Sequence, residues 1–214
     1  MLILKHNTLV LALLLLCCTA GFAQRKALTA TESAAVKAKI TASTQNLQSL
    51  QSDFTQTRQL SYMDNAIQSA GKLSFKAPGK IRWEYTSPTA YVVIFDGQTM
   101  HAIAGGRTKT TNLAANRRMQ GLNDLLVGSV QGGNMLDESR FNITYYREKT
   151  NYVAVLTPKD KSLSRYIRQV ELVFNNTSLL LTQVTLSDPA GDSTQLVFTN
   201  QRKNTSIPDA TFQP

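Results

Sequence analysis

Few side chains in this sequence have the chemistry of a nucleophile, a general base or a metal ligand. Both cysteines, Cys17 and Cys18, lie within residues 1–23, and His101 is the single histidine beyond them. Thiol and zinc sites need clusters of such residues, and a serine nucleophile needs a base. Ser69-Ala70-Gly71-Lys72 matches a Ser-x-x-Lys motif, but it leads into a β pattern. We therefore expect no catalytic residue, no metal and no cofactor, and a structural role for His101.

Residues 1–23 have the pattern of an export signal. Lys5 supplies a positive start, an apolar run extends from Thr8 to Cys18, and Gly21-Phe22-Ala23 offers small residues before a cleavage site. We expect cleavage before Gln24 and a periplasmic protein. Two alternatives stay open. One is a lipidated cysteine, although neither cysteine suits a lipobox, and the other is a retained anchor, although the run is shorter than the ~20 residues that span a bilayer.

The composition of the chain favours one globular domain over residues 24–214. Of 214 residues, 42% are hydrophobic and 17% are charged, and no repeat or linker divides them. Lys and Arg number 23 against 14 Asp and Glu, which gives a net charge of +9. Because the basic residues are interspersed with acidic and apolar ones, we exclude nucleic acid as a partner. The charge solubilises the surface or attracts anionic headgroups and acidic partners.

Hydrophobic periodicity predicts helical structure at the start of this domain. The helical pattern covers residues 24–50 and begins at Thr29, whose spacing to Glu32 suits a capping box. Val36, Ile40 and Leu47 lie near one face of this helix. A second, short helical pattern occurs within residues 116–136, where leucines recur near helical spacing at Leu122, Leu125 and Leu126.

The rest of the chain alternates with a period of two, as strands do. The expected strands cover residues 54–58, 70–76, 80–86, 91–95, 98–104, 141–147, 152–157, 166–174, 179–187 and 194–200. Alternation is sharpest at Ile81, Trp83 and Tyr85, which share one face. Asp96-Gly97 is a strong hairpin signal.

About ten to eleven strands in one antiparallel sheet have to curl or close, because flat sheets of that width are rare. The expected fold is therefore α+β, mainly β. A curled sheet has a concave apolar face, which is either left open for a ligand or filled by its own side chains. Composition does not separate these two outcomes.

Several motifs, in order along the chain, resemble the periplasmic outer-membrane lipoprotein carrier family, LolA. They occur in the ranges 50–56, 71–85, 95–97 and 156–159, with Pro88 between and Asn204, Ile207-Pro208 and Phe212 near the end. The second range reads Gly71-Lys72-Leu73-Ser74-Phe75-Lys76-Ala77-Pro78-Gly79-Lys80-Ile81-Arg82-Trp83-Glu84-Tyr85.

The resemblance implies a half-open, incomplete antiparallel β-barrel covered by short helices, with an apolar cavity for acyl chains. It implies a monomeric chaperone without catalysis, which takes acylated lipoproteins from an inner-membrane lipoprotein-releasing ABC transporter to the outer membrane. An outer-membrane receptor is a further implied partner. Residues carried over to the cavity are Leu73, Phe75, Ile81, Trp83, Tyr85, Val93, Phe95 and Met100. Residues carried over to the lid are Val36, Ile40, Leu47, Leu122, Leu125 and Leu126.

One position departs from the family pattern. The family often has an arginine directly before the motif proline, where it bonds to the lid, and this chain has Ala77. Lys76 and Arg82 are nearby cations, but alternation directs both away from the Trp83 face. Two other functions stay open: a carrier or sensor of another envelope lipid or glycolipid, and a lipid-processing enzyme that would depend on His101.

Overall fold

A computed structural model of the chain describes residues 25–113 and 136–214. The expected signal segment and the expected lid residues Leu122, Leu125 and Leu126 lie outside these residues. The described strands form one antiparallel sheet in the order β1-β8-β9-β10-β11-β12-β2-β3-β4-β5-β6-β7. The strands are β1 (Lys26–Ala27), β2 (Ser49–Gln59), β3 (Ile67–Lys76), β4 (Lys80–Ser87), β5 (Tyr91–Phe95), β6 (Thr99–Ala104), β7 (Arg107–Asn112), β8 (Phe141–Glu148), β9 (Asn151–Pro158), β10 (Gln169–Asn175), β11 (Leu181–Ser187) and β12 (Ser193–Lys203).

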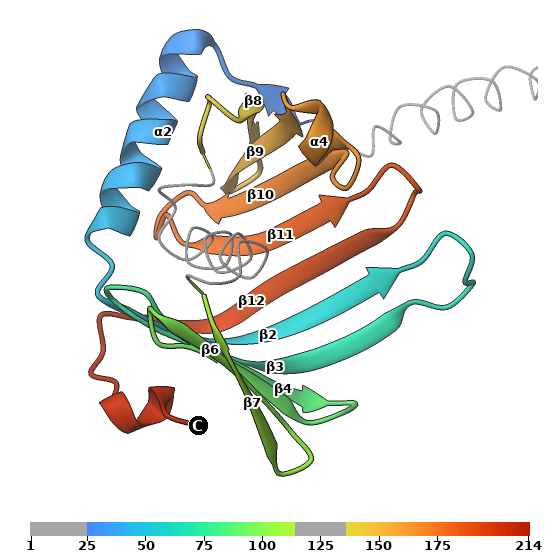
Figure 1. Ribbon diagram of the computed structural model, residues 1–214. Helices are drawn as coiled ribbons and strands as arrows, with labels where there is room; N and C mark the ends of the chain where they lie inside the picture. Colours follow the sequence, from blue (N-terminus) through green and yellow to red (C-terminus); the bar gives the residue numbers. More distant parts are fainter. Residues whose placement is uncertain (1–24, 114–135) are drawn as a thin grey trace, which may run out of the picture.

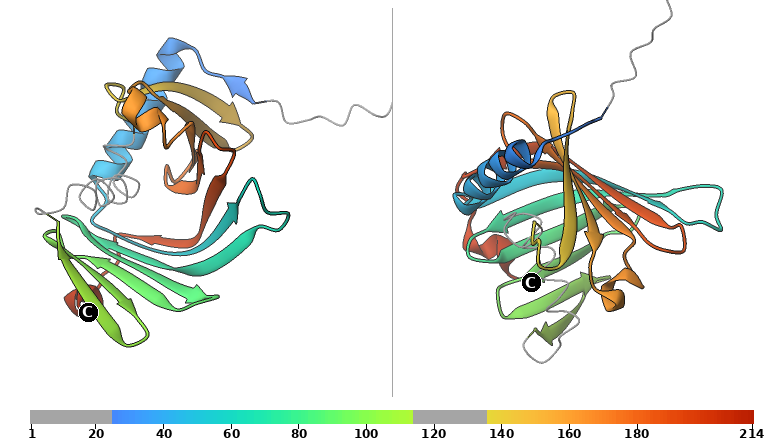
Figure 2. Two further views of the ribbon diagram at one scale, coloured as in Figure 1. Left: turned by 45° about the vertical axis from the view of Figure 1, so that its right-hand side comes forward. Right: turned by 90° about the horizontal axis from the view of Figure 1, so that it is seen from above.

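The sheet is bent into an open trough (Figures 1 and 2). One wall contains β8 to β11, the other contains β3 to β7, and β12 and β2 join the walls at the bend. No pairing connects the first and last strands, so the described sheet is not closed into a barrel. The expected half-open, mainly β fold is confirmed.

Helix α2 (Ala30–Gln45) lies along one side of the trough (Figure 1). The side chain of Thr29 accepts a hydrogen bond from the amide of Glu32, and the Glu32 carboxylate accepts one from the amide of Thr29. This capping box satisfies two amides at the helix start. The helix is shorter than its periodicity predicts, because residues 26–27 form β1 and residues from Ser49 onward form β2.

Alternation in the sequence predicts most strands, and the exceptions have a clear cause. Strand β4 places Ile81 and Trp83 inside and leaves Lys80 and Arg82 on the other face. The Asp96-Gly97 turn joins β5 to β6 as expected. Strand β7 is not predicted by the sequence, because its residues, Arg-Thr-Lys-Thr-Thr-Asn, are polar on both faces.

The C-terminal segment covers part of the convex face of the sheet. The short helix η1 (Asp209–Phe212) follows Ile207, and Ile207 and Phe212 bury Ile94 from outside. Lys76 Nζ donates to the Ile207 carbonyl at 3.0 Å and pairs with Asp209 at 2.9 Å. The concave face is therefore the side of the sheet that this segment leaves free.

Candidate functional site

An apolar cluster on the concave face of β2 to β6 is the main candidate site. It contains every residue that the resemblance assigns to the cavity: Leu73, Phe75, Ile81, Trp83 and Phe95 are buried, and Tyr85, Val93 and Met100 are partly buried against them. Strand register produces this arrangement. Leu73 lies opposite Trp83 and Trp83 opposite Val93, while Phe75, Ile81, Phe95 and Met100 form a second row.

Trp83 lies at the centre of this cluster among aromatic rings. Its ring centroid is 4.9 Å from that of Phe54 and 6.2 Å from that of Phe198. Phe54 has room there because residue 71 is glycine: a Cβ at Gly71 would lie 2.7 Å from Phe54 Cζ and 2.0 Å from the Glu84 carbonyl oxygen. Gly71 therefore allows the aromatic ring to pack directly on the backbone of β3.

The opposite wall has an apolar cluster of its own, to which α2 contributes. Val36 and Ile40 pack there with Tyr145, Leu172 and Phe174. Leu47, which follows the helix, belongs to the Trp83 cluster instead. The described residues of the expected lid therefore contact both walls of the trough.

A small cavity lies at the bend of the sheet, between β10 and β3. It is lined by Thr44, Leu50, Leu73, Phe174, Leu180, Leu181, Phe198 and Gln201, and its volume is about 20 Å³. Leu181 and Val184 pack against both apolar clusters. A cavity of this size has room for about one water molecule. The apolar concave face therefore continues across the bend from one wall of the trough to the other.

Three polar groups lie within this apolar face. The Tyr85 hydroxyl donates to Gln56 Oε1 at 2.9 Å, and burial raises the pKa of Tyr85, so the hydroxyl remains a donor. Trp83 Nε1 and the Tyr145 hydroxyl are buried without a hydrogen-bond partner among the described residues. Burial raises the pKa of Tyr145 to about 12, with a further contribution from Glu138. An unpaired buried donor costs about 1–3 kcal/mol, so each is a point where a ligand acceptor would be stabilised.

Sequence reasoning missed several members of the Trp83 cluster. Leu50 and Phe54 of β2 and Phe198 of β12 are buried there, with Leu113 and Leu180. Alternation identifies Leu50 and Phe54, which are four residues apart and therefore lie on the same face of β2. Leu113 lies outside every expected strand, and Leu180 falls within the expected strand 179–187 but just before the observed β11.

Neither cation near Ala77 faces the cluster. Lys76 contacts the C-terminal segment, and Arg82 Nε pairs with Glu84 at 3.0 Å on the convex face. Ala77 itself packs against the Trp83 cluster. The position that often holds an arginine in the family thus contributes apolar surface here.

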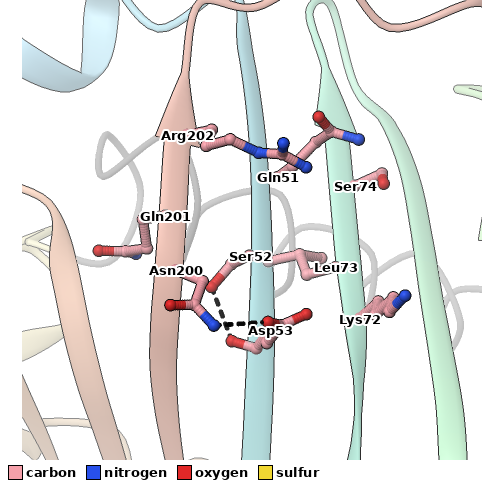
Figure 3. Close-up of a pocket in the computed structure, with 9 residues that line it drawn as sticks. All are labelled: Gln51, Ser52, Asp53, Lys72, Leu73, Ser74, Asn200, Gln201 and Arg202. Carbon is pink, nitrogen blue, oxygen red and sulfur yellow. Dashed lines mark hydrogen bonds between the residues drawn. The ribbon is translucent and has the colours of Figure 1, made fainter.

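A polar pocket of about 480 Å³ occurs on the convex face at the irregular end of β12 (Figure 3). Asn200 has a positive φ of 53°, and its amide donates to Asp53 Oδ2 at 2.8 Å. Lys72 and Arg202 also line this pocket. Its polar lining does not suit an acyl chain, so we do not assign it to the same ligand.

The candidates for catalysis are far from a catalytic geometry. Ser69 and Lys72 lie three residues apart in β3, which separates them by about 10 Å and turns them to opposite faces. His101 Nε2 lies 3.0 Å from Thr99 Oγ1 and 3.4 Å from Asp96 Oδ2, and Nδ1 lies 3.0 Å from Thr110 Oγ1. These contacts tie together the hairpin of β5, β6 and β7.

In residues 25–113 and 136–214, no three His, Cys, Asp or Glu side chains gather into a group able to hold a metal ion. None of the described helices has both the length and the hydropathy needed to cross a bilayer.

The chain is similar to known carrier proteins over most of its length. A family model described as outer membrane lipoprotein carrier protein LolA matches residues 45–214. The outer-membrane lipoprotein carrier protein of Chromobacterium violaceum is 28% identical over 188 residues, covering 86% of this chain and 85% of the relative. That of Cupriavidus pinatubonensis is 25% identical over 173 residues, covering 78% and 77%.

Among solved structures, the lipoprotein LppX of Mycobacterium tuberculosis aligns with a TM-score of 0.49 and 11% identity, covering 84% of this chain and 99% of LppX. MucB in complex with MucA aligns with a TM-score of 0.46 and 16% identity, covering 87% and 60%. Because the family model matches well over half of the sequence, the chain belongs to the LolA family of outer-membrane lipoprotein carrier proteins.

Proposed function

We propose that this protein carries acylated lipoproteins across the periplasm by enclosing their acyl chains in the trough of the sheet. The observation that supports the proposal is the continuous apolar concave face, which contains the Trp83 cluster and the α2 cluster. Acyl chains need such a surface, because each methylene buried from water contributes about 0.8 kcal/mol. A chain of about 16 carbons therefore gains roughly 12 kcal/mol on leaving water.

Binding uses the open side of the trough. The cavity of about 20 Å³ at the bend is too small for an acyl chain, so in this proposal the chain lies along the apolar side chains of the concave face. Helix α2 packs against the wall formed by β8 to β11, through Val36 and Ile40. We therefore assign α2 and Leu47 to the lid. Moving this lid away from the apolar clusters costs free energy, which offsets part of the binding free energy and keeps release feasible.

Trp83 supplies a polar anchor as well as apolar surface in this proposal. Its Nε1 is a buried donor without a partner among the described residues. An ester or amide carbonyl at the head of an acyl chain would accept this hydrogen bond. Such a contact fixes the position of the head while the aromatic rings around Trp83 contact the tail.

The proposed route has three steps, none of which needs catalysis. The chain is exported with cleavage before Gln24, takes lipoproteins from an inner-membrane ABC transporter, and gives them up at the outer membrane, to a receptor or to the bilayer. We propose a monomer, because the apolar surface used for binding faces the inside of its own trough.

The test is to purify the protein from its native periplasm and identify bound molecules by mass spectrometry. The proposal predicts triacylated or diacylated lipoproteins. A glycolipid or another envelope lipid in their place would favour the alternative carrier function. Absence of any acylated cargo, together with normal outer-membrane lipoproteins in cells that lack the protein, would refute the proposal.

A further inference from the structure

Large apolar side chains are exposed at one end of the sheet. In the described part of the chain, the exposed large hydrophobic residues are Tyr62, Met63, Ile67, Tyr91, Tyr166 and Leu186. Each lies beside a strand end that belongs to the same rim of the trough, on the right in Figure 1. We call this set the apolar rim.

Strand pairing shows that these residues share one rim. Arg58 near the end of β2 pairs with Ile67 at the start of β3, and Ser193 at the start of β12 pairs with Gln59. On the next strands, Ser187 at the end of β11 pairs with Gln169 at the start of β10. Tyr91 begins β5, opposite Tyr85 of β4. The apolar rim therefore follows one edge of the trough from β10 to β5.

Hydrogen bonds hold neighbouring loops of this rim together. The amide of Ser61, in the β2–β3 loop, donates to Asp192 Oδ1 of the β11–β12 turn at 2.8 Å. The amide of Arg168 donates to the Ser187 carbonyl at 2.8 Å. Exposed side chains on loops that are joined in this way have a fixed arrangement, unlike those on independent loops.

The opposite rim has a different character. It contains the charged groups Lys76, Lys80 and Lys203, and the first two pair with Asp209. No large apolar side chain of the described residues is exposed there. The asymmetry makes the apolar rim a property of one end of the molecule rather than of its whole surface.

The apolar rim is continuous with the concave face. Tyr91 is stacked on Tyr85, with ring centroids 4.3 Å apart and an interplanar angle of 12°. Tyr85 in turn packs on Phe54 at 5.0 Å, inside the Trp83 cluster. A row of aromatic rings therefore leads from the rim to Trp83.

Charges at this rim suit a surface that carries phosphate groups. Arg58, Arg165 and Arg168 are exposed, and their side chains form no ion pair or hydrogen bond within the described part of the chain. Three of the acidic groups nearby accept amide hydrogen bonds from their own or adjoining loops: Asp160, Asp188 and Asp192. Asp64 and Lys161 lie on the same connections, Arg140 and Lys159 lie beside Tyr166, and Arg107 lies at the β6–β7 turn. The chain as a whole has a net charge of +9.

We propose that the apolar rim docks on the surface of a phospholipid bilayer. Tyrosine is enriched where one end of a side chain is apolar and the other is wet, as at membrane interfaces, and three of the six rim residues are tyrosines. Exposed arginines between them match the phosphates of anionic lipids, although Arg58 also attracts Asp192 and Arg165 also attracts Asp160. The six side chains stand along an arc instead of forming one contiguous patch, which a protein hot spot would require.

Docking at this end would let acyl chains pass between bilayer and trough without crossing open water. This consequence depends on the proposed carrier function, whereas the docking itself does not. The aromatic row from Tyr91 to Trp83 gives the path, because its apolar surface is continuous from rim to cluster.

The experiment is flotation of the exported chain, beginning at Gln24, with vesicles of phosphatidylethanolamine and phosphatidylglycerol, and with vesicles of phosphatidylcholine alone. The test variant is Tyr62→Ser/Tyr166→Ser, because these side chains are 79% and 75% exposed and make few contacts in the fold. The matched control is Tyr62→Trp/Tyr166→Trp, which keeps an aromatic ring at each site. We expect the serine variant to lose about tenfold in partitioning on the anionic vesicles, which is about 1.4 kcal/mol. The tryptophan variant should partition at least as well as the native chain.

Two results would overturn the docking proposal. One is a native chain that floats with neither kind of vesicle. This result would overturn the proposal even if the chain binds a membrane protein. The other is a serine variant that partitions like the native chain, which would place membrane contact elsewhere. Binding of a soluble fluorescent fatty acid to the serine variant, measured without vesicles, reports on the carrier function separately. Unchanged fatty-acid binding with lost flotation supports both proposals.

Discussion

The substitutions Trp83→Glu and Arg82→Glu place a carboxylate on opposite faces of strand β4. Trp83 is 5% exposed, and its ring lies 4.9 Å from that of Phe54. Arg82 lies on the convex face, pairs with Glu84, and has a side chain that is 25% exposed. A comparison of Trp83→Glu with Arg82→Glu therefore isolates the effect of the face.

The two substitutions differ strongly in expected cost. Removing a large aromatic side chain from a packed core costs about 3–5 kcal/mol. Keeping a buried glutamate neutral at pH 7, from a normal pKa of about 4.3, costs about 3.7 kcal/mol more. Loss of the partly buried Arg82–Glu84 pair costs about 0.2–1 kcal/mol, and the new carboxylate also repels Glu84 on the same face of β4. For fatty-acid binding by the folded protein, we expect a loss of at least about a hundredfold for Trp83→Glu and less than about threefold for Arg82→Glu.

The assay is displacement of a fluorescent fatty acid, after urea unfolding has shown which variants are folded. Trp83→Leu is the safeguard against a trivial loss of folding, because it keeps an apolar side chain. It should lose only the contribution of the Nε1 hydrogen bond, about 0.5–1.5 kcal/mol, which is at most about tenfold in affinity. If Arg82→Glu and Trp83→Glu lose affinity equally, or if a folded Trp83→Glu protein binds like the native chain, the assignment of the concave face to the ligand is wrong.

Three further predictions concern the fold that forms the trough. Thr29→Ala should lower the free energy of unfolding by about 1 kcal/mol in urea titration, because it removes the side-chain cap of α2; an unchanged value would show that the capping box does not stabilise the protein. Gly71→Val should destabilise far more than this, because its Cβ would overlap Phe54, and circular dichroism melting should show a clearly lower Tm; native-like melting would contradict the packing. Burial alone would raise the pKa of Asp96, but hydrogen bonds from the Thr99 hydroxyl and amide outweigh it and hold the pKa near 2. The resulting stabilisation is present above about pH 4 and lost as pH falls toward 2. Asp96→Asn should therefore flatten the dependence of the free energy of unfolding on pH between about 4 and 2. A dependence identical to that of the native chain would refute the role of Asp96.

Local pattern predicted much of the sheet and of the Trp83 cluster. Alternation in β4 identified the face of Ile81 and Trp83, and pairing in the structure extended that face to Leu73 and Val93. The same reasoning failed for β7, whose residues are polar on both faces and which is recognised only by its pairing with β6. Hydrophobic periodicity reports burial of a face, so a strand without a buried face leaves no such signal.

The bend of the sheet could not be predicted from local pattern. The small cavity joins Leu50 and Leu73 to Phe174 and Leu181, which are more than a hundred residues away in the sequence. Whether two apolar faces touch or stand apart depends on how the sheet bends at β12 and β2, and periodicity within one strand does not encode that bend. The apolar rim is likewise visible only once strand order is known, because its six residues come from four separate connections.

Trp83 is the single tryptophan of the chain and therefore reports directly on what enters the trough. The most direct measurement is its fluorescence during titration with dibrominated stearate, with plain stearate as the reference. Bromine quenches only at short range, so the account predicts saturable quenching by the brominated chain beyond any change caused by plain stearate. Saturable fatty-acid binding without quenching of Trp83 would contradict it, because the ligand would then occupy a site other than the concave face.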